Sequence, residues 1–125
     1  MIDPAKTLKQ ILRQYGHDVL IQRRLDDNFL YSEQFERVTT RHFYPSAETM
    51  SQIQKEDIEG TNAAVDLVYY FESTVNPRQG DRIYEEDPRN TDGGNLYLVD
   101  FAGPVRGKMG KIVYWIAGVT KERPN

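Results

Sequence analysis

The chain contains no cysteine, so disulfide bonds, thiolate ligands and thiol nucleophiles are excluded. Its 125 residues must be held together by packing or by partner subunits, which fits an intracellular or assembled protein better than a secreted scaffold. No window approaches the roughly 18 apolar residues of a membrane-spanning helix. The opening residues MIDPAKTLKQ also lack the basic and apolar segments of a secretion signal. We therefore expect a soluble protein that has no membrane among its partners.

Positive charge and histidine are both scarce. Lys and Arg total 16 against 19 for Asp and Glu, so the net charge of -3 gives no general attraction to nucleic acid. The two histidines, His17 and His42, are far apart in the sequence and show no HxxxH or HExxH spacing. We expect neither histidine to bind a metal, and we expect no cofactor.

Catalytic motifs are missing as well. The chain has no Gly-x-Ser-x-Gly motif and no Ser or Thr with an evident base. Glu85, Glu86 and Asp87 resemble a carboxylate pair, but they are adjacent, and neighbours along a strand point to opposite sides. The run therefore predicts a solvated acidic turn. We expect no enzymatic activity.

The length and the 38% hydrophobic content predict a single domain over 1–125. A helix is expected at 4–15, with Asp3 as its cap, Pro4 in the first position and Gly16 as its end. Its apolar side chains are Leu8, Ile11, Leu12 and Tyr15. At helical spacing they share one face, which covers either the core or a neighbouring subunit.

The rest of the chain alternates short strand-like runs with Gly, Pro and Asn turns. The expected strands are 17–24, 35–44, 65–72 with one buried face, 82–85, a stretch around 96–98, and 111–120. Both faces of 111–120 are apolar, so it is central or meets another chain. The polar segment 46–62 has room for one short helix around 48–55, but we predict a long mobile or interface loop. The fold is thus predicted to be mainly β, a small antiparallel β-barrel or sandwich over 17–121 with one N-terminal helix.

The stretch GPVRGKMGK, at 103–111, is rich in glycine and basic residues. Its spacing does not match a phosphate-binding loop, because three residues separate Gly103 from Gly107 and no Ser or Thr follows the lysine. We predict a hairpin with a basic tip formed by Arg106, Lys108 and Lys111. Such a tip can contact backbone phosphates or an acidic partner.

Three segments of the second half carry a resemblance. The turn Gly80-Asp81-Arg82-Ile83, the strand LYLVDFAGPVRG and the strand KIVYWIAGVTKE resemble the small β-barrel neck proteins of tailed bacteriophages. These are head-completion or head-tail joining proteins and include stoppers, in which this turn typically precedes a strand. The resemblance covers roughly 65–122, under half of the chain.

The resemblance implies a structural virion protein, assembled in the bacterial cytoplasm, that forms a ring between head and tail. The implied partners are copies of itself, the portal or adaptor ring, the tail tube or tail terminator, and the DNA in the channel. A ring subunit needs two different contact surfaces, for which Tyr15, Tyr70 and Trp115 are the expected aromatic anchors. Asp81 and Arg82 are expected to form a turn-stabilising pair or an inter-subunit salt bridge.

A second interpretation is a single-stranded nucleic-acid-binding barrel. Tyr69, Tyr70, Tyr97 and Tyr114 would stack on bases while the basic tip follows the backbone. A monomer with strongly salt-dependent affinity for single strands would favour this module. Self-assembly, or capture by a tail tube, would favour the ring.

Overall fold

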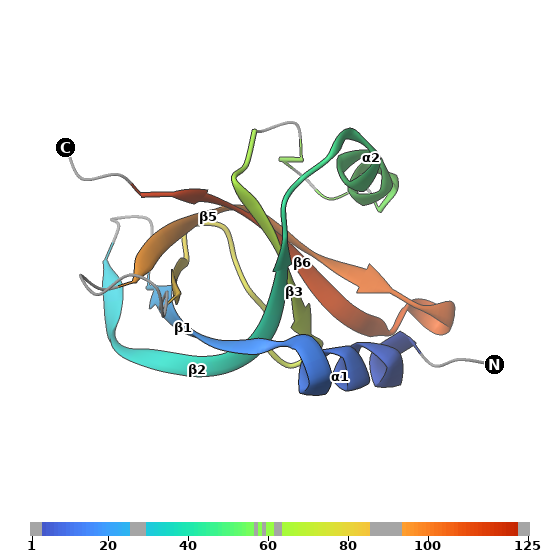
Figure 1. Ribbon diagram of the computed structural model, residues 1–125, viewed down its shortest axis with the longest axis horizontal. Helices are drawn as coiled ribbons and strands as arrows, with labels where there is room; N and C mark the ends of the chain where they lie inside the picture. The colour runs from blue at the N-terminus through green and yellow to red at the C-terminus, as the bar shows by residue number, and fades with distance from the viewer. Residues whose placement is uncertain are drawn as a thin grey trace.

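The strands close into an antiparallel barrel in the order β1-β2-β3-β6-β5-β4 (Figure 1). The computed structural model describes residues 4–25, 30–56, 58, 60–61, 64–85 and 94–122. Its helices are α1 (Pro4–Tyr15), α2 (Ala47–Lys55) and the 3-10 turn η1 (Lys108–Gly110). Its strands are β1 (His17–Arg24), β2 (Tyr31–Phe43), β3 (Leu67–Glu72), β4 (Arg82–Glu85), β5 (Asn95–Arg106) and β6 (Ile112–Lys121). The predicted fold class, a mainly β protein with a small antiparallel barrel and an N-terminal helix, is confirmed.

α1 begins at Pro4 and ends at Tyr15, as predicted. The N–H of Gly16 donates to the carbonyl of Leu12 over 3.0 Å, and β1 starts at the next residue. Asp3, the predicted cap, lies outside the described residues. Of the predicted apolar face only Leu12 is buried, so the body of the chain covers this face incompletely.

α2 corrects the prediction of a long loop at 46–62. Ser46 caps this helix, because its Oγ accepts a hydrogen bond of 3.1 Å from the N–H of Thr49. Ile53 is 2% exposed and packs with Ile58 and the partly buried Met50 against the outer side of the barrel. The polar composition was misleading because Met50 and Ile53, with Ile58 just after the helix, suffice to pack one side of a short helix.

Two hydrophobic clusters hold the chain together, one inside the barrel and one outside it. Buried residues of the inner cluster are Val19, Ile21, Leu67, Tyr69, Phe71, Val75, Ile83, Tyr97, Val99, Ala117 and Val119. Those of the outer cluster are Ile53, Ile58, Val68, Phe101, Val105 and Ile116. β3 contributes to both clusters, so the prediction that it buries one face is wrong. β6 is likewise buried on both faces from Ile116 to Val119, whereas Ile112 to Trp115 are only partly buried.

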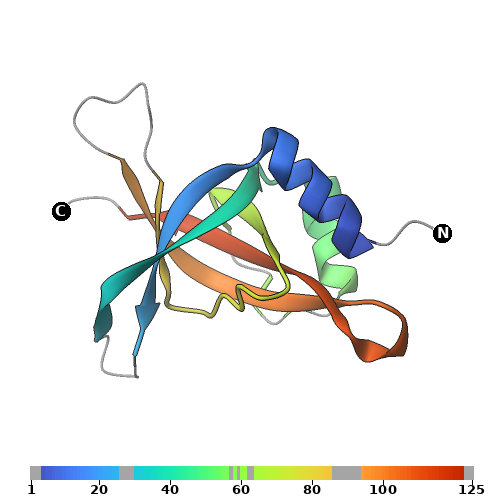
Figure 2. The ribbon, with the colours of Figure 1, turned by 90° about the horizontal axis from the view of Figure 1, so that it is seen from below.

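β5 and β6 form a long hairpin that projects beyond the barrel (Figure 2). The N–H of Gly107 donates to the carbonyl of Lys111 over 2.8 Å, and Arg106 Nη1 donates to the carbonyl of Gly110 over 2.8 Å. The predicted hairpin is therefore present, but β5 is longer than the predicted stretch 96–98. β2 is longer as well and begins at Tyr31.

The link from β3 to β4 crosses one end of the barrel. β3 pairs with β2 and β6, whereas β4 pairs with β1 and β5, so residues 73–81 must pass from one side to the other. This connection contains the Gly80-Asp81 turn. The turn therefore lies at this end of the barrel, between the crossing connection and β4.

Candidate functional site

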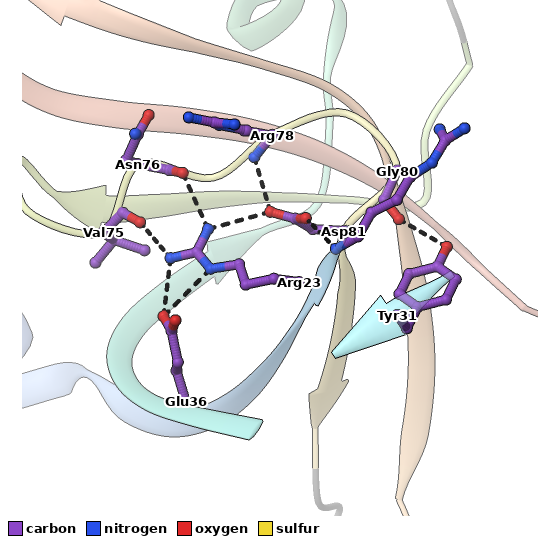
Figure 3. Close-up of polar contacts among 9 residues, drawn as sticks. Arg23, Tyr31, Glu36, Val75, Asn76, Arg78, Gly80 and Asp81 are labelled. Atoms are coloured by element: carbon purple, nitrogen blue, oxygen red, sulfur yellow. Dashed lines mark hydrogen bonds and ion pairs between the residues drawn. The ribbon is translucent and has the colours of Figure 1, made fainter. Parts of the chain in front are cut away.

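Gly80 and Asp81 end the crossing connection directly before β4. Gly80 has a φ of +94°, and a Cβ at this position would lie 2.6 Å from Arg24 Cδ. Only glycine adopts this conformation at low cost. Its carbonyl accepts a hydrogen bond of 2.7 Å from the hydroxyl of Tyr31, which joins the turn to the start of β2 (Figure 3).

The carboxylate of Asp81 is buried, the residue being 1% exposed. Its Oδ1 accepts a hydrogen bond of 3.0 Å from the backbone N–H of Arg24. Its Oδ2 accepts from the backbone N–H of Arg78 at 2.9 Å and from Arg23 Nη1 at 3.1 Å (Figure 3). A buried carboxylate needs such partners, and here they come from β1 and from the crossing connection.

Arg23 extends the network across the end of the barrel. Its Nη2 lies 2.9 Å from Glu36 Oε2 on β2, and its guanidinium also donates to the carbonyls of Val75 and Asn76. Burial lowers the pKa of Arg23, but the carboxylates of Glu36 and Asp81 outweigh it and raise that pKa above the ordinary value. The guanidinium therefore stays charged and ties β1, β2 and the connection together.

Within the chain, Asp81 pairs with Arg23 and not with Arg82, which corrects the turn-stabilising pair; an inter-subunit salt bridge stays a prediction. Arg82 Nε lies 3.2 Å from Glu122 Oε1, and its guanidinium lies 4.1 Å from the ring centre of Tyr31. Asp81 does hold the turn, but its charged partner is Arg23. Sequence adjacency was misleading because the side chain of Asp81 turns into the barrel end while Arg82 already belongs to β4.

A second polar cluster lies at the opposite end of β1 and β4. It consists of His17, His42 and Glu85, which we call the His-His-Glu cluster. His17 Nε2 lies 2.6 Å from Glu85 Oε1, and His42 Nδ1 lies 3.1 Å from the same oxygen. The hydroxyl of Tyr69 donates to the other oxygen, Glu85 Oε2. Two imidazoles and one phenol thus surround a single carboxylate.

The cluster corrects the prediction for Glu85 and brings together two histidines whose closeness the sequence did not predict. The prediction of a solvated acidic turn is wrong for Glu85, whose side chain is only 13% exposed; Glu86 and Asp87 lie outside the described residues. His17 and His42, distant in the sequence, have ring centres 5.1 Å apart in an edge-to-face arrangement. Sequence spacing missed them because the pairings of β1 with β2 and with β4 bring them together.

A signal for the cluster was present in the strand alternation. His17 is two residues before the buried Val19, and Glu85 is two residues after the buried Ile83. Alternation therefore places both side chains on the inner face. His42 lies opposite Tyr69, another inner residue, in the pairing of β2 with β3.

The electrostatics of the cluster favour a charged carboxylate beside a protonated phenol. Burial raises the pKa of Glu85, but His42, Tyr69 and His17 outweigh it, so the pKa lies below the ordinary value. Burial and the neighbouring Glu85 raise the pKa of Tyr69 far above that of a free tyrosine. The Tyr69 hydroxyl therefore remains a hydrogen-bond donor to the carboxylate.

An apolar groove separates α1 from the outer surface of the barrel. The groove has a volume of about 480 Å³. Its lining residues are Thr7, Leu8, Ile11, Arg41, Phe43, Tyr70 and Tyr114. Tyr15 is 65% exposed at the end of α1, with the guanidinium of Arg41 5.3 Å from its ring centre. Tyr44, the residue after β2, is 79% exposed.

The three predicted interface residues do not form one surface. Tyr70 lines the groove, and Tyr15 lies exposed at the end of the groove-lining helix. Trp115 instead packs partly buried against the inner cluster, and its Nε1 donates to the carbonyl of Ser73 over 3.0 Å.

The predicted base-stacking and basic residues are also apart. Tyr69 and Tyr97 are buried inside the barrel and offer no ring face to solvent. Tyr70 and Tyr114 are partly buried beside the outer cluster. Arg106, Lys108 and Lys111 are exposed at the hairpin end, as the predicted basic tip requires.

No helix within the described ranges is long and apolar enough to cross a lipid bilayer. Comparison with family models, with curated proteins and with solved structures finds no match to this chain.

Proposed function

We propose that this chain is a structural protein in the neck of a tailed bacteriophage. It forms one subunit of a ring that joins the head or portal to the tail and surrounds the DNA channel. The observation that carries the proposal is the Gly80-Asp81-Arg82-Ile83 motif, whose turn at Gly80 and Asp81 leads directly into β4 of a small antiparallel barrel. The resemblance to neck proteins implies this same placement.

The buried contacts of the turn support a structural role. Asp81 and Gly80 bind β1, β2 and the crossing connection, so the motif closes the barrel. Its residue types follow from the local geometry, because a positive φ requires glycine and the converging N–H groups require a carboxylate. We propose no enzymatic activity for the chain.

The incompletely covered side of α1 supports a contact with a neighbouring copy. Ring assembly brings two different surfaces of each subunit together. The groove beneath α1 and the exposed Tyr15 supply one apolar surface of this kind. The basic tip of the projecting hairpin, formed by Arg106, Lys108 and Lys111, is exposed and can contact an acidic partner ring or the DNA. The proposed partners are thus copies of the chain, the portal or adaptor ring, the tail tube or terminator, and DNA, all within the virion.

A genetic experiment tests the joining role. Deleting the gene for this chain from the phage that encodes it should leave heads and tails that do not join, and the wild-type chain supplied from a plasmid should restore joined particles. Electron microscopy of the lysates provides the measurement. Normally joined particles in the deletion lysate would contradict the proposal.

A further inference from the structure

We propose that His17, His42 and Glu85 form a binding site for a divalent transition-metal ion, with zinc as the first candidate. The site lies inside one end of the barrel, between β1, β2 and β4. It involves none of the residues that support the neck proposal. The inference therefore stands apart from that proposal.

The donor atoms converge as metal ligation requires. One ligand atom from each of the three residues lies within 4.8 Å of the other two. Two ligands of a tetrahedral zinc ion, each about 2.0–2.1 Å from the metal, are about 3.4 Å apart. The contacts of 2.6 Å from His17 Nε2 and 3.1 Å from His42 Nδ1 to Glu85 Oε1 are shorter. Entry of an ion therefore needs each of the two nitrogens to move away from Glu85 Oε1 by less than about 1 Å.

The ring nitrogens are the second observation. His17 Nε2 and His42 Nδ1 are buried, and neither takes part in a hydrogen bond of normal geometry despite the nearby carboxylate. Buried polar atoms without a hydrogen bond are rare and call for an explanation such as an ion. A cation at the centre of the cluster would accept a lone pair from each nitrogen and from Glu85 Oε1.

The surroundings of Glu85 resemble those of a metal-binding carboxylate. The Tyr69 hydroxyl donates to Oε2 and thereby leaves Oε1 directed at the two histidines. Such outer hydrogen bonds orient the ligands of metal sites and typically change affinity about 10–100-fold when removed. His42 also has Tyr69 on one side, with ring centres 5.7 Å apart, so its ring is held by packing.

The donor set selects the class of metal. Two imidazole nitrogens and one carboxylate oxygen suit zinc and its first-row neighbours, whereas magnesium and calcium prefer oxygen ligands alone. The chain has no cysteine, and its two histidines both lie in this cluster. Three protein ligands leave one position of a tetrahedral zinc ion for water. A bound ion would cross-link β1, β2 and β4 at the end of the barrel opposite Asp81.

The test uses the full chain, purified without a histidine tag and stripped of metal with a chelator. Calorimetric titration with zinc chloride should give one ion per chain, and a hundredfold excess over the dissociation constant should raise the Tm by several degrees. Cobalt(II) in place of zinc should give the visible absorption of a four-coordinate ion with nitrogen and oxygen ligands. These wild-type measurements do not depend on the folding of any variant.

Single substitutions then test which side chains bind the ion. His17→Ala, His42→Ala and Glu85→Gln should each weaken zinc binding by at least about a hundredfold, and Tyr69→Phe by about tenfold. Glu122→Gln is the matched control, because it neutralises a part-exposed carboxylate that is paired with Arg82 away from the cluster. This control should bind zinc as the wild type does. Circular dichroism reports whether each variant is folded.

Two results would overturn the metal site. The first is a folded wild-type chain that binds neither zinc nor cobalt at millimolar concentration. The second is stoichiometric binding that folded His17→Ala and His42→Ala variants retain in full. Neither result bears on the location of the chain in the virion, which is measured separately.

Discussion

Asp81 is the residue on which the closed end of the barrel depends most. Its carboxylate is 1% exposed and joins the backbone of Arg24, the backbone of Arg78 and the guanidinium of Arg23. Removing a buried carboxylate leaves these donors without a partner, and that loss costs more than the net value of the bonds themselves. The neighbouring Arg82 lies in a part-exposed pair with Glu122, where an ion pair contributes little.

We therefore expect Asp81→Ala to lower the free energy of unfolding by about 2–4 kcal/mol. Glu122→Ala, the matched control, should lower it by at most about 1 kcal/mol. Urea denaturation followed by tryptophan fluorescence measures both. Equal effects of the two substitutions would show that the network around Asp81 does not close the barrel.

Tyr70 and Tyr114 give the stability of the chain a pH dependence. Burial raises the pKa of both phenols above the ordinary value of 10.0, and Tyr70 and Glu56 raise that of Tyr114 further. Above about pH 10 the two phenols therefore stay protonated in the folded state, whereas in the unfolded state they lose their protons. Their contribution is complete below about pH 10 and is lost as the pH rises from there toward the folded-state values.

The expected result is a free energy of unfolding that falls with pH above about pH 10, with a shallower fall in Tyr70→Phe. Urea midpoints at pH 8, 9, 10 and 11 measure this slope. Between pH 8 and 9 Tyr70→Phe should follow the slope of the wild type, which serves as the internal control. An identical slope in both proteins above pH 10 would rule out Tyr70 as a source of the effect.

At the scale of elements, α2 buries part of the outer surface of the barrel. It covers the outer side of β3, β5 and β6 with Ile53, and Ile58 follows it in the same cluster. Val68 of β3 and Ile116 of β6 are therefore buried on the outer side of the barrel as well. α1 contacts β2, β3 and β6, but the groove beside Tyr70 and Tyr114 remains open.

Ile53→Ala should lower the free energy of unfolding by about 2–4 kcal/mol, because it removes most of a buried side chain and leaves a cavity. Ser46→Ala should cost about 1 kcal/mol through loss of the helix cap. Gln52→Ala on the exposed side of α2 is the control and should have little effect. If Ile53→Ala behaves like Gln52→Ala in urea denaturation, α2 is not packed on the barrel.

At the scale of the whole molecule, the two ends of the barrel are built differently. Asp81 and Arg23 close one end with a charged network, while the His-His-Glu cluster occupies the other end. The projecting β5–β6 hairpin and the open side of α1 remain available for contacts between subunits (Figure 2). This division suits a ring subunit whose body is rigid and whose contacts lie at its edges.

Tyr15→Asp should reduce the yield of joined particles by roughly tenfold or more, because a charge would enter the apolar contact proposed beside α1. The isolated chain should fold normally, since Tyr15 is 65% exposed. Plaque titres and electron microscopy after complementation of the deletion phage give the measurement, with Gln52→Asp as the control. Full complementation by Tyr15→Asp would remove this surface from the proposed interface.

The parts of the fold that local patterns determine could be predicted from the sequence. Pro4 and Gly16 bound α1, and the β-branched run at β1 matches the predicted 17–24. α2 could not be predicted with the same ease, because its apolar contacts come from distant strands. Asp81 and the His-His-Glu cluster depend on which strands are neighbours, and local periodicity does not determine that order.

Cryo-electron microscopy of phage particles from the lysate that produces this chain tests the proposed neck role most directly, with mass spectrometry to identify the chain in the purified particles. The account predicts a ring of identical six-stranded barrels between the head and the tail, around the DNA channel. Particles with a complete neck that contain no copy of this chain would contradict it.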